Sequence, residues 1–244
     1  MEDFGFRKVN RDEKPQLVNK VFENVAFRYD LMNDLMSGGL HRLWKDTLID
    51  WLAPRKNKHL IDVAGGTGDI SFRFLKRTKG AGKVTIVDRN EQMLNEGKAR
   101  LKEPHKKNNI EWICADAMEL PFSQETFDYF TISFGIRNVL DIGRCLSEAY
   151  RVLKPGGRLL VLEFSSVDNV TLKKLYDLYS FNLVPKLGEF VTGDAESYRY
   201  LVESIRKFPS QKEFLYMIDQ AGFKQTTYRN LTFGVVAIHS GWKV

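Results

Sequence analysis

Residues 60–69 read Leu-Ile-Asp-Val-Ala-Gly-Gly-Thr-Gly-Asp, and this stretch decides the fold. An apolar run leads to Asp62, and three glycines follow within four residues: Gly65, Gly66 and Gly68. The pattern is typical of a buried strand that passes through a tight turn into a helix. Because glycine carries no Cβ, a ligand can lie directly against the main chain of such a turn. The stretch therefore predicts a ligand site at the carboxyl end of a strand.

Strands and helices alternate along the chain around this turn. Short apolar runs predict strands at 59–63, 83–88, 110–114, 127–134 and 158–164, and helical patterns fill 68–79, 90–103 and 141–153. Two further strands are expected near 223–230 and 234–240. Alternation of this kind predicts an α/β fold in which a mostly parallel sheet has helices on both faces.

The chain divides into four segments of one predicted domain. Apolar residues at spacings of three and four predict helices at 14–37 and 43–52, so residues 1–55 are expected to form a helical N-terminal extension. Residues 56–167 form the ligand-binding core, and 221–244 hold the last two strands. The intervening 168–220 is mostly helical and interrupts the alternation, so it is expected to be a lid at the ligand end of the sheet.

The composition excludes several classes of protein. The 244 residues contain no apolar run of about 18, which a transmembrane helix would need, and the N-terminus lacks the apolar core of a signal peptide. The two cysteines and four histidines show no metal-ligand spacing, so no metal is expected. The net charge of +6 comes from scattered lysines and arginines, which could simply be solvated residues of loops and helix faces. If they have a function, an anionic membrane surface is favoured over nucleic acid.

The glycine turn is compatible with a dinucleotide, a nucleotide phosphate or the amino-acid part of S-adenosylmethionine. No Lys-Ser or Lys-Thr pair follows Gly68, which excludes a phosphate loop, and Ser71 stands where the dinucleotide motif has its third glycine. Asp62 occupies the strand-end position where class I methyltransferases carry an acid that holds the turn. Ala64 replaces the first glycine of their usual pattern, which is a mild departure.

Two further carboxylates follow the next two strands. Asp88 ends the second strand, where a carboxylate accepts hydrogen bonds from both hydroxyls of a ribose. Asp116 and Ala117 follow the third strand, where side chain and main chain can contact an adenine. Each acid alone could be a surface or capping residue. Three acids at successive strand ends favour S-adenosylmethionine over a dinucleotide. The residues expected to bind it are Asp62, Gly65, Gly66, Gly68, Asp88, Asp116 and Ala117.

Several motifs of the sequence resemble one family. Tyr-Asp-Leu-Met-Asn-Asp at 29–34, followed by Gly-Leu-His-Arg-Leu-Trp-Lys at 39–45, is similar to the first signature of the ubiquinone/menaquinone biosynthesis C-methyltransferases of the UbiE type. Ile-Ser-Phe-Gly-Ile-Arg-Asn-Val at 132–139 resembles the second. Arg-Val-Leu-Lys-Pro-Gly-Gly-Arg at 151–158 also matches but is common to many methyltransferases. The resemblance extends from residue 4 to the C-terminus.

The resemblance implies a fold and a reaction. The fold is that of a Rossmann-like class I methyltransferase, with a seven-stranded, mostly parallel sheet. The reaction is methylation of a ring carbon in a polyprenylated quinol, either 2-methoxy-6-polyprenyl-1,4-benzoquinol or demethylmenaquinol. By the same resemblance, the contacts to S-adenosylmethionine fall on Thr67, Asp88, Asp116, Ala117 and Ser133.

The resemblance also assigns the catalytic residues to Arg137, Asn138 and Tyr29. A guanidinium after the fourth strand would stabilise a developing phenolate, although its pKa above about 12 makes it a poor direct base. Arg137 could instead be a structural ion-pair residue, and Tyr29 an ordinary core aromatic. His41 has a suitable pKa for a base but could equally pack or cap a helix. Residues 198–200 are expected either to line the substrate entrance or to pack.

Partners and location are expectations from the same resemblance. We expect peripheral attachment to a membrane, contacts with other quinone-biosynthesis proteins and a homodimer, with no nucleic acid. The location would be the cytoplasmic face of the bacterial inner membrane, or the matrix side of the mitochondrial inner membrane after removal of a presequence. The alternatives are another class I methyltransferase, acting on a sterol or small phenol, and a non-catalytic scaffold of a quinone-biosynthesis complex.

Overall fold

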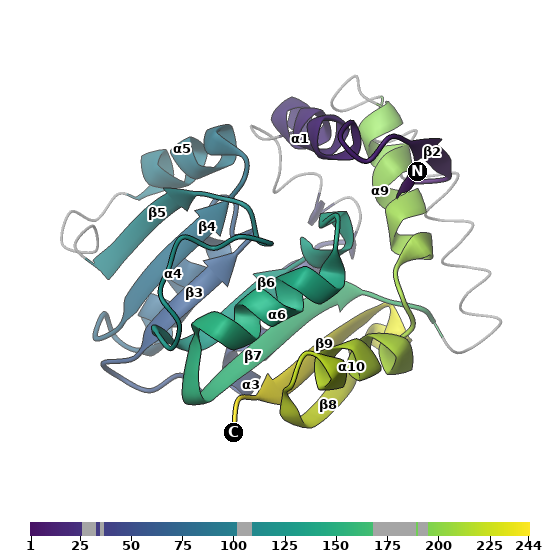
Figure 1. The fold of residues 1–244 in the computed structure, drawn as a ribbon. Coiled ribbons are helices and arrows are strands. Elements are labelled where there is room, and N and C mark those ends of the chain that lie inside the picture. Colours follow the sequence, from purple (N-terminus) through teal and green to yellow (C-terminus); the bar gives the residue numbers. More distant parts are fainter. Residues whose placement is uncertain (26–32, 35–36, 102–108, 168–188, 190–194) are drawn as a thin grey trace.

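A seven-stranded sheet forms the centre of the protein (Figure 1). The computed structural model describes residues 1–25, 33–34, 37–101, 109–167, 189 and 195–244. The strand order is β5-β4-β3-β6-β7-β9-β8, and within the described sheet only β9 runs antiparallel to its neighbours. The strands are β3 (His59–Val63), β4 (Lys83–Asp88), β5 (Ile110–Cys114), β6 (Phe127–Ser133), β7 (Leu153–Phe164), β8 (Lys224–Leu231) and β9 (Val236–Trp242). The predicted mostly parallel sheet is confirmed.

Helices cover both faces of this sheet. Successive side chains of a strand point to opposite faces, so a strand whose residues are all apolar needs a helix on each face to bury them. Leu60 of β3 packs in the core beneath α3 (His41–Leu52) and α4 (Asp69–Arg77), to which α5 (Glu91–Arg100) also contributes. Ile61, the next residue, packs in the opposite core beneath α6 (Ile142–Val152) and α10 (Gln211–Gln220). Both residues are completely buried, which explains why the strand reads as a continuous apolar run.

The strand that follows α6 is longer than its sequence predicts. We expected it to begin at Arg158, after the turn Pro155-Gly156-Gly157, but β7 already begins at Leu153. Leu153 pairs with Phe127, and the register then shifts before Arg158 pairs with Tyr129. The turn residues therefore form an irregularity inside the strand pairing, which a prediction from local residue types alone cannot distinguish from a chain reversal.

The N-terminal extension differs from the purely helical segment that we expected. It opens with a hairpin of β1 (Glu2–Phe4) and β2 (Arg7–Val9), and Gly5 provides the left-handed turn with φ +60°. The reason is a contact far along the chain, since the ring of Phe4 stacks on Tyr200 with centroids 4.1 Å apart. Helix α1 (Lys14–Val25) follows, and the continuation of the expected helix over 26–32 and 35–36 lies outside the described residues.

The two described helices of the segment 168–220, which we expected to form a lid, lie in different parts of the protein. Residues 168–188 and 190–194 lie outside the described residues. Helix α9 (Ala195–Lys207) contacts α1, β1 and the short helix η3 (Ile136–Asn138) near the ligand end of the sheet. Helix α10, in contrast, packs against β8, β9 and α6, so it is one of the helices that cover the sheet. Among the helices of the described ranges, none is long and apolar enough to cross a membrane.

Candidate active site

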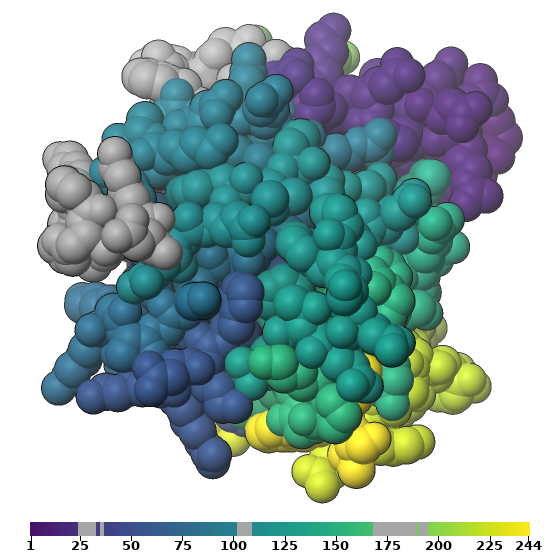
Figure 2. All heavy atoms as spheres, turned by 60° about the vertical axis from the view of Figure 1, so that its left-hand side comes forward, coloured from purple at the N-terminus to yellow at the C-terminus, as the bar shows by residue number. Residues whose placement is uncertain are grey.

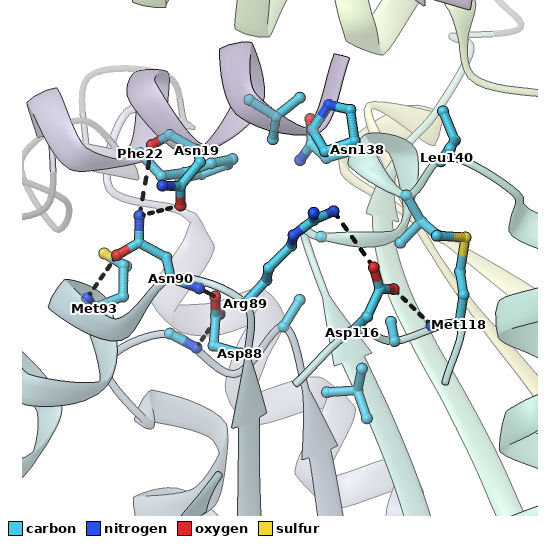
Figure 3. A pocket seen from close by; sticks show the side chains of 18 of the residues that line it. Asn19, Phe22, Asp88, Arg89, Asn90, Met93, Asp116, Met118, Asn138 and Leu140 are labelled. Atoms are coloured by element: carbon cyan, nitrogen blue, oxygen red, sulfur yellow. Dashed lines mark hydrogen bonds and ion pairs between the residues drawn. The ribbon is translucent and has the colours of Figure 1, made fainter. Parts of the chain in front are cut away.

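A pocket lies where the strand order reverses, beyond the carboxyl ends of β3, β4, β5 and β6. Ligands bind at this position in open α/β sheets because the loops from adjacent strands diverge there. Residues that follow the four strands line its floor and walls, and α1 crosses above it (Figure 3). In Figure 2 the N-terminal segment, in purple, adjoins teal atoms from the middle of the chain. The pocket is therefore assembled from both the sheet and the N-terminal extension.

The glycine turn after β3 brings main chain to the pocket. Gly66 lines the pocket and has φ +53°, and its N–H donates to Asp88 Oδ2 at 2.8 Å. Gly68 begins α4 with φ +83°, where an added Cβ would approach Ile86 to 2.9 Å. Ala64, at the first position of the turn, also has a positive φ of +49°. The left-handed conformation is therefore kept where the usual class I methyltransferase pattern has glycine, although alanine adopts it at a cost of about 1 kcal/mol.

Asp88 is held so that its carboxylate faces the pocket (Figure 3). Besides the Gly66 N–H, it accepts the Asn90 N–H on Oδ1 at 2.8 Å. Burial raises the pKa of Asp88, and these backbone donors oppose that rise by stabilising the anion. Each oxygen keeps a further lone pair, so the group can accept hydrogen bonds from the vicinal hydroxyls of a ribose.

Asp116 stands at the end of the neighbouring strand, on the opposite side of Arg89 (Figure 3). Its Oδ1 accepts the Met118 N–H at 2.8 Å, and its Oδ2 is 3.3 Å from the Arg89 guanidinium. Ala117 and Met118 line the same wall. An apolar wall with a carboxylate and free main chain is suited to a flat heteroaromatic ring with an amino group.

Helix α1 forms the roof of the pocket. It contributes Lys14, Pro15, Val18, Asn19 and Phe22 to the lining. Asn19 connects the roof to the floor, because its Oδ1 accepts from Asn90 Nδ2 at 2.8 Å. Sequence reasoning did not assign these residues to the site. Their helical periodicity indicates an amphipathic helix, but nothing local indicates what its apolar face covers.

Asn138 and its neighbours form the remaining wall after β6. Phe134, Gly135, Asn138, Val139 and Leu140 line the pocket. Phe134 has φ +55°, which turns the chain away from the strand and towards η3. The expected participation of Asn138 in a site is consistent with this placement, since it lies beside the carboxyl end of the same sheet as Asp88.

Arg137 has a different environment from the one we expected. Its Nη1 is 2.7 Å from Glu163 Oε1 and also donates to the Phe134 carbonyl at 2.6 Å, and its Nε donates to Ser204 Oγ at 3.3 Å. The side chains of Arg137 and Glu163 are 4% and 1% exposed, so this is a buried ion pair. Arg137 is not among the residues that line the pocket. The contacts favour the structural ion-pair interpretation, in which Arg137 supports the wall that carries Asn138.

Asp62 and several turn residues also lie behind the pocket surface. Asp62 is 1% exposed and accepts hydrogen bonds from Ser71 Oγ and Thr131 Oγ1, both at 2.8 Å. Burial raises its pKa to about 6. The carboxylate therefore supports the turn from below, which was one of its two expected roles, and does not line the pocket. Gly65, Thr67, Gly68 and Ser133 are likewise outside the lining.

The predicted residues thus separate into three groups. Gly66, Asp88, Asp116, Ala117 and Asn138 come together at the pocket. The others within the described residues lie directly behind it or beside it: Asp62, Gly65, Thr67, Gly68, Ser133 and Arg137. Tyr29 lies outside the described residues.

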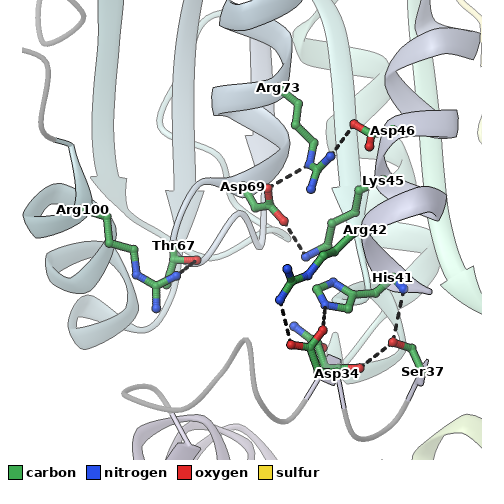
Figure 4. A network of polar contacts seen from close by, with 11 residues as sticks. Asp34, Ser37, His41, Arg42, Lys45, Asp46, Thr67, Asp69, Arg73 and Arg100 are labelled. Atoms are coloured by element: carbon green, nitrogen blue, oxygen red, sulfur yellow. Dashed lines mark hydrogen bonds and ion pairs between the residues drawn. The ribbon is translucent and has the colours of Figure 1, made fainter. Parts of the chain in front are cut away.

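His41 belongs to a polar network between α3 and α4 (Figure 4). It is 3% exposed, its Nε2 is 2.8 Å from Asp34 Oδ1, and it is not a lining residue. Burial, together with the charge of Lys45, lowers the pKa of His41. Lys45 is paired with Asp69, the first residue of α4, at 2.8 Å. The network fixes α3 against the start of α4 and so holds the glycine turn, which is a structural explanation for His41.

The residues present fit S-adenosylmethionine. A carboxylate for a ribose, an apolar wall for an adenine and exposed glycine main chain lie around one pocket. One buried polar atom at the wall that follows β6, Asn138 Nδ2, has no hydrogen-bond partner in the described part of the chain. Buried polar atoms without partners are rare in native proteins and commonly await a ligand.

Comparison with known proteins agrees with this geometry. The model of the ubiE/COQ5 methyltransferase family matches residues 8–243. The chain belongs to this family. It is 59% identical, over 241 residues, to the ubiquinone/menaquinone biosynthesis C-methyltransferase UbiE of Dinoroseobacter shibae, and the match covers 99% of this chain and 96% of that protein. The protein is therefore an S-adenosylmethionine-dependent methyltransferase, as the resemblance predicted.

Solved structures show the same fold at low sequence identity. A SAM-dependent methyltransferase of Thermotoga maritima superposes with a TM-score of 0.63 at 20% identity, covering 92% of this chain and 99% of that one. The phosphoethanolamine N-methyltransferase 2 of Haemonchus contortus, solved with S-adenosylmethionine, gives a TM-score of 0.60 at 16% identity, covering 84% and 53%. The fold of the family member described here is thus that of the class I methyltransferases.

Proposed function

We propose that this family member transfers the methyl group of S-adenosylmethionine to a ring carbon of a polyprenylated quinol. The acceptor would be 2-methoxy-6-polyprenyl-1,4-benzoquinol, demethylmenaquinol or both. The observation that carries the proposal is the 59% identity, over almost the whole chain, to a protein named for C-methylation in ubiquinone/menaquinone biosynthesis.

The residues of the pocket have distinct tasks in this reaction. Asp88 and Gly66 would hold the ribose, and Asp116 with Ala117 the adenine. When bound, the cofactor supplies an electrophilic methyl group. A quinol that loses a phenolic proton carries negative charge on the ring carbon beside the oxygen, so the protein has to orient that carbon and stabilise the oxygen. Asn138 is one of the lining residues that can donate to such an oxygen, and Arg137 supports it through the buried pair with Glu163.

The roof would shield a bound cofactor from water. Val18 and Phe22 of α1 place apolar side chains opposite Asp88 and Asn90. In a water-poor site, hydrogen bonds to a developing charge are stronger than in bulk solvent. A roof that covers a bound cofactor would have to move away for the cofactor to exchange.

The proposal is tested by methyl transfer from a labelled donor to each reduced quinone, with the position of the new methyl group determined by mass spectrometry. Cofactor affinity is measured in parallel for Asp88→Asn, which we expect to weaken binding at least about tenfold because it removes a charge-assisted acceptor. Asp128→Asn is the matched control: Asp128 also accepts a backbone N–H, from His59 at 2.9 Å, but at the opposite end of the sheet. No methylated product from either quinol would refute the proposed acceptor class.

We also propose that the protein attaches peripherally to an anionic membrane surface, where its substrate would reside. The net charge of +6 and the exposed side chains of Leu43 and Phe233, which are 63% and 78% accessible, support this. Flotation with anionic liposomes is expected to carry the protein upward, and sedimentation of all protein would contradict it. The homodimer, the contacts with other biosynthetic proteins and the choice of membrane face stay predictions.

A further inference from the structure

Within the described residues, the side-chain amide of Asn138 has one hydrogen-bond partner, and this partner determines how the amide is oriented. The hydroxyl of Tyr200, on α9, donates to Asn138 Oδ1 at 2.9 Å, across 62 residues of sequence. The other end of the amide, Nδ2, is buried and has no partner in the described ranges of the chain. Asn138 itself lines the pocket. One end of the amide is therefore fixed by the protein, and the other is left for a ligand.

We propose that Tyr200 is a positioning residue whose hydroxyl holds the amide of Asn138 so that Nδ2 can donate to the oxygen of the acceptor ring. The inference rests on the proposed function for the identity of that oxygen. It adds a role for Tyr200, which the sequence alone left between an entrance residue and a packing residue.

The surroundings of Tyr200 keep its hydroxyl in the donor role. The side chain is 4% exposed, and burial raises its pKa, so the hydroxyl stays protonated at neutral pH. A neutral tyrosine that faces a carboxamide oxygen donates to it. If the amide turned over, its nitrogen would face the hydroxyl and its oxygen would face the pocket, where it would repel a phenolate.

Tyr200 is itself held from several sides. Its ring stacks on Phe4 at 4.1 Å, and the turn that follows Phe4 is attached to α9, because the Phe6 N–H donates to Glu203 Oε2 at 2.9 Å. One turn along α9, Ser204 Oγ lies 3.3 Å from Arg137 Nε. Helix α9 thus contacts both Arg137 and Asn138, and the N-terminal hairpin fixes α9. This explains structurally why the hairpin and α9 meet at this edge of the pocket.

The first test compares the steady-state kinetics of Tyr200→Phe, Asn138→Ala and the double variant. Tyr200→Phe keeps the ring that stacks on Phe4 and removes only the hydroxyl. We expect kcat to fall about two- to tenfold, the net value of one neutral hydrogen bond, with cofactor KM unchanged. Asn138→Ala is expected to lower kcat about 10²–10³-fold, because it removes a donor to the developing charge. On that background Tyr200→Phe should have no further effect on kcat.

A matched control separates this role from a general loss of packing. Tyr129 is also buried, and its hydroxyl accepts from the Arg55 N–H at 3.2 Å, but it lies at the far end of β6. We expect Tyr129→Phe to leave kcat unchanged. An equal loss of kcat from Tyr200→Phe in the parent and in Asn138→Ala would overturn the proposal, and so would an unchanged kcat in Tyr200→Phe.

The second test does not depend on the acceptor. The side-chain amide signals of Asn138 in a ¹⁵N-labelled protein are identified by their loss in Asn138→Ala. We expect Tyr200→Phe, but not Tyr129→Phe, to shift these signals and to accelerate their hydrogen exchange several-fold, because the amide is no longer held. Unaltered signals in Tyr200→Phe would refute the positioning role even if the quinols are substrates. Failure of the parent to methylate either quinol, with the expected amide changes, would refute only the proposed acceptor.

Discussion

Ala64 and Gly135 face each other across the floor of the pocket so closely that only one of them can carry a methyl group. A Cβ built on Gly135 would lie 2.5 Å from the Cβ of Ala64, whereas ordinary contacts are 3.4–4 Å. The next atom that it would meet, Ile132 Cγ1, is at a comfortable 3.6 Å. Gly135 has φ −121°, which an L-residue can adopt, so the obstacle is the methyl group of Ala64 alone. We therefore predict that Gly135→Ala destabilises the protein and that Ala64→Gly rescues it.

The magnitude follows from the overlap. Inserting a methyl group into a packed site costs about 1–3 kcal/mol in free energy of unfolding. For a chain of this length, each 1 kcal/mol lowers the melting temperature by roughly 2–4 °C. Ala64→Gly alone relieves a positive φ of +49° but adds chain entropy to the unfolded state, so we expect a net change within about 1 kcal/mol. In the double variant the methyl group has moved from one residue to the other, and its stability should match that of Ala64→Gly within about 0.5 kcal/mol.

The measurement is a double-mutant cycle on denaturant unfolding, with the melting temperature as a second observable. A coupling free energy of at least about 1 kcal/mol between the two positions is expected. Equal destabilisation by Gly135→Ala in the parent and in Ala64→Gly would show that the two methyl groups do not compete for the same space, and would refute this steric account.

Three further predictions concern buried charge and the roof. Burial raises the pKa of Asp62 to about 6, so the stability that this protonated group contributes is complete below pH 4 and is lost as the pH rises through 6. Between pH 4 and 7, the free energy of unfolding of Asp62→Asn should therefore rise by about 3 kcal/mol relative to that of the parent. A difference between the two proteins that does not change with pH would contradict this. Asn19→Ala removes the 2.8 Å hydrogen bond from Asn90 that links α1 to the floor of the pocket. Stopped-flow measurements should then show that the cofactor dissociates about three- to tenfold faster. An unchanged dissociation rate would argue against a roof that moves. Glu163→Gln leaves the guanidinium of Arg137 buried without its anion, so it should lower the free energy of unfolding by about 3–5 kcal/mol. Adding Arg137→Met to this variant should restore most of the loss. If stability does not recover, the broken ion pair is not the cause of the loss.

Much of the fold and half of the site could be predicted from local sequence. The strands at 59–63 and 110–114 were expected with the bounds that they have, because buried parallel strands read as short apolar runs between turn residues. Asp88 and Asp116 were found because carboxyl ends of parallel strands meet at one edge. The hairpin at the N-terminus was missed, because strands of three residues have no detectable period and depend on the contact of Phe4 with α9.

The sequence by itself determined the donor half of this protein: a strand, a glycine turn and acids at successive strand ends, all of which act within a few residues of their own position. Only the tertiary structure decided which of the predicted side chains reach the pocket. The tertiary structure placed Asp62 and Arg137 behind the wall of the pocket, where they form hydrogen bonds and an ion pair with residues far along the chain. It placed α1 over the pocket as its roof. It also paired Asn138 with Tyr200, 62 residues away. Local sequence patterns reflect backbone conformation and burial. Which residue pairs with a charged or amide side chain depends instead on packing between segments that are distant in the sequence.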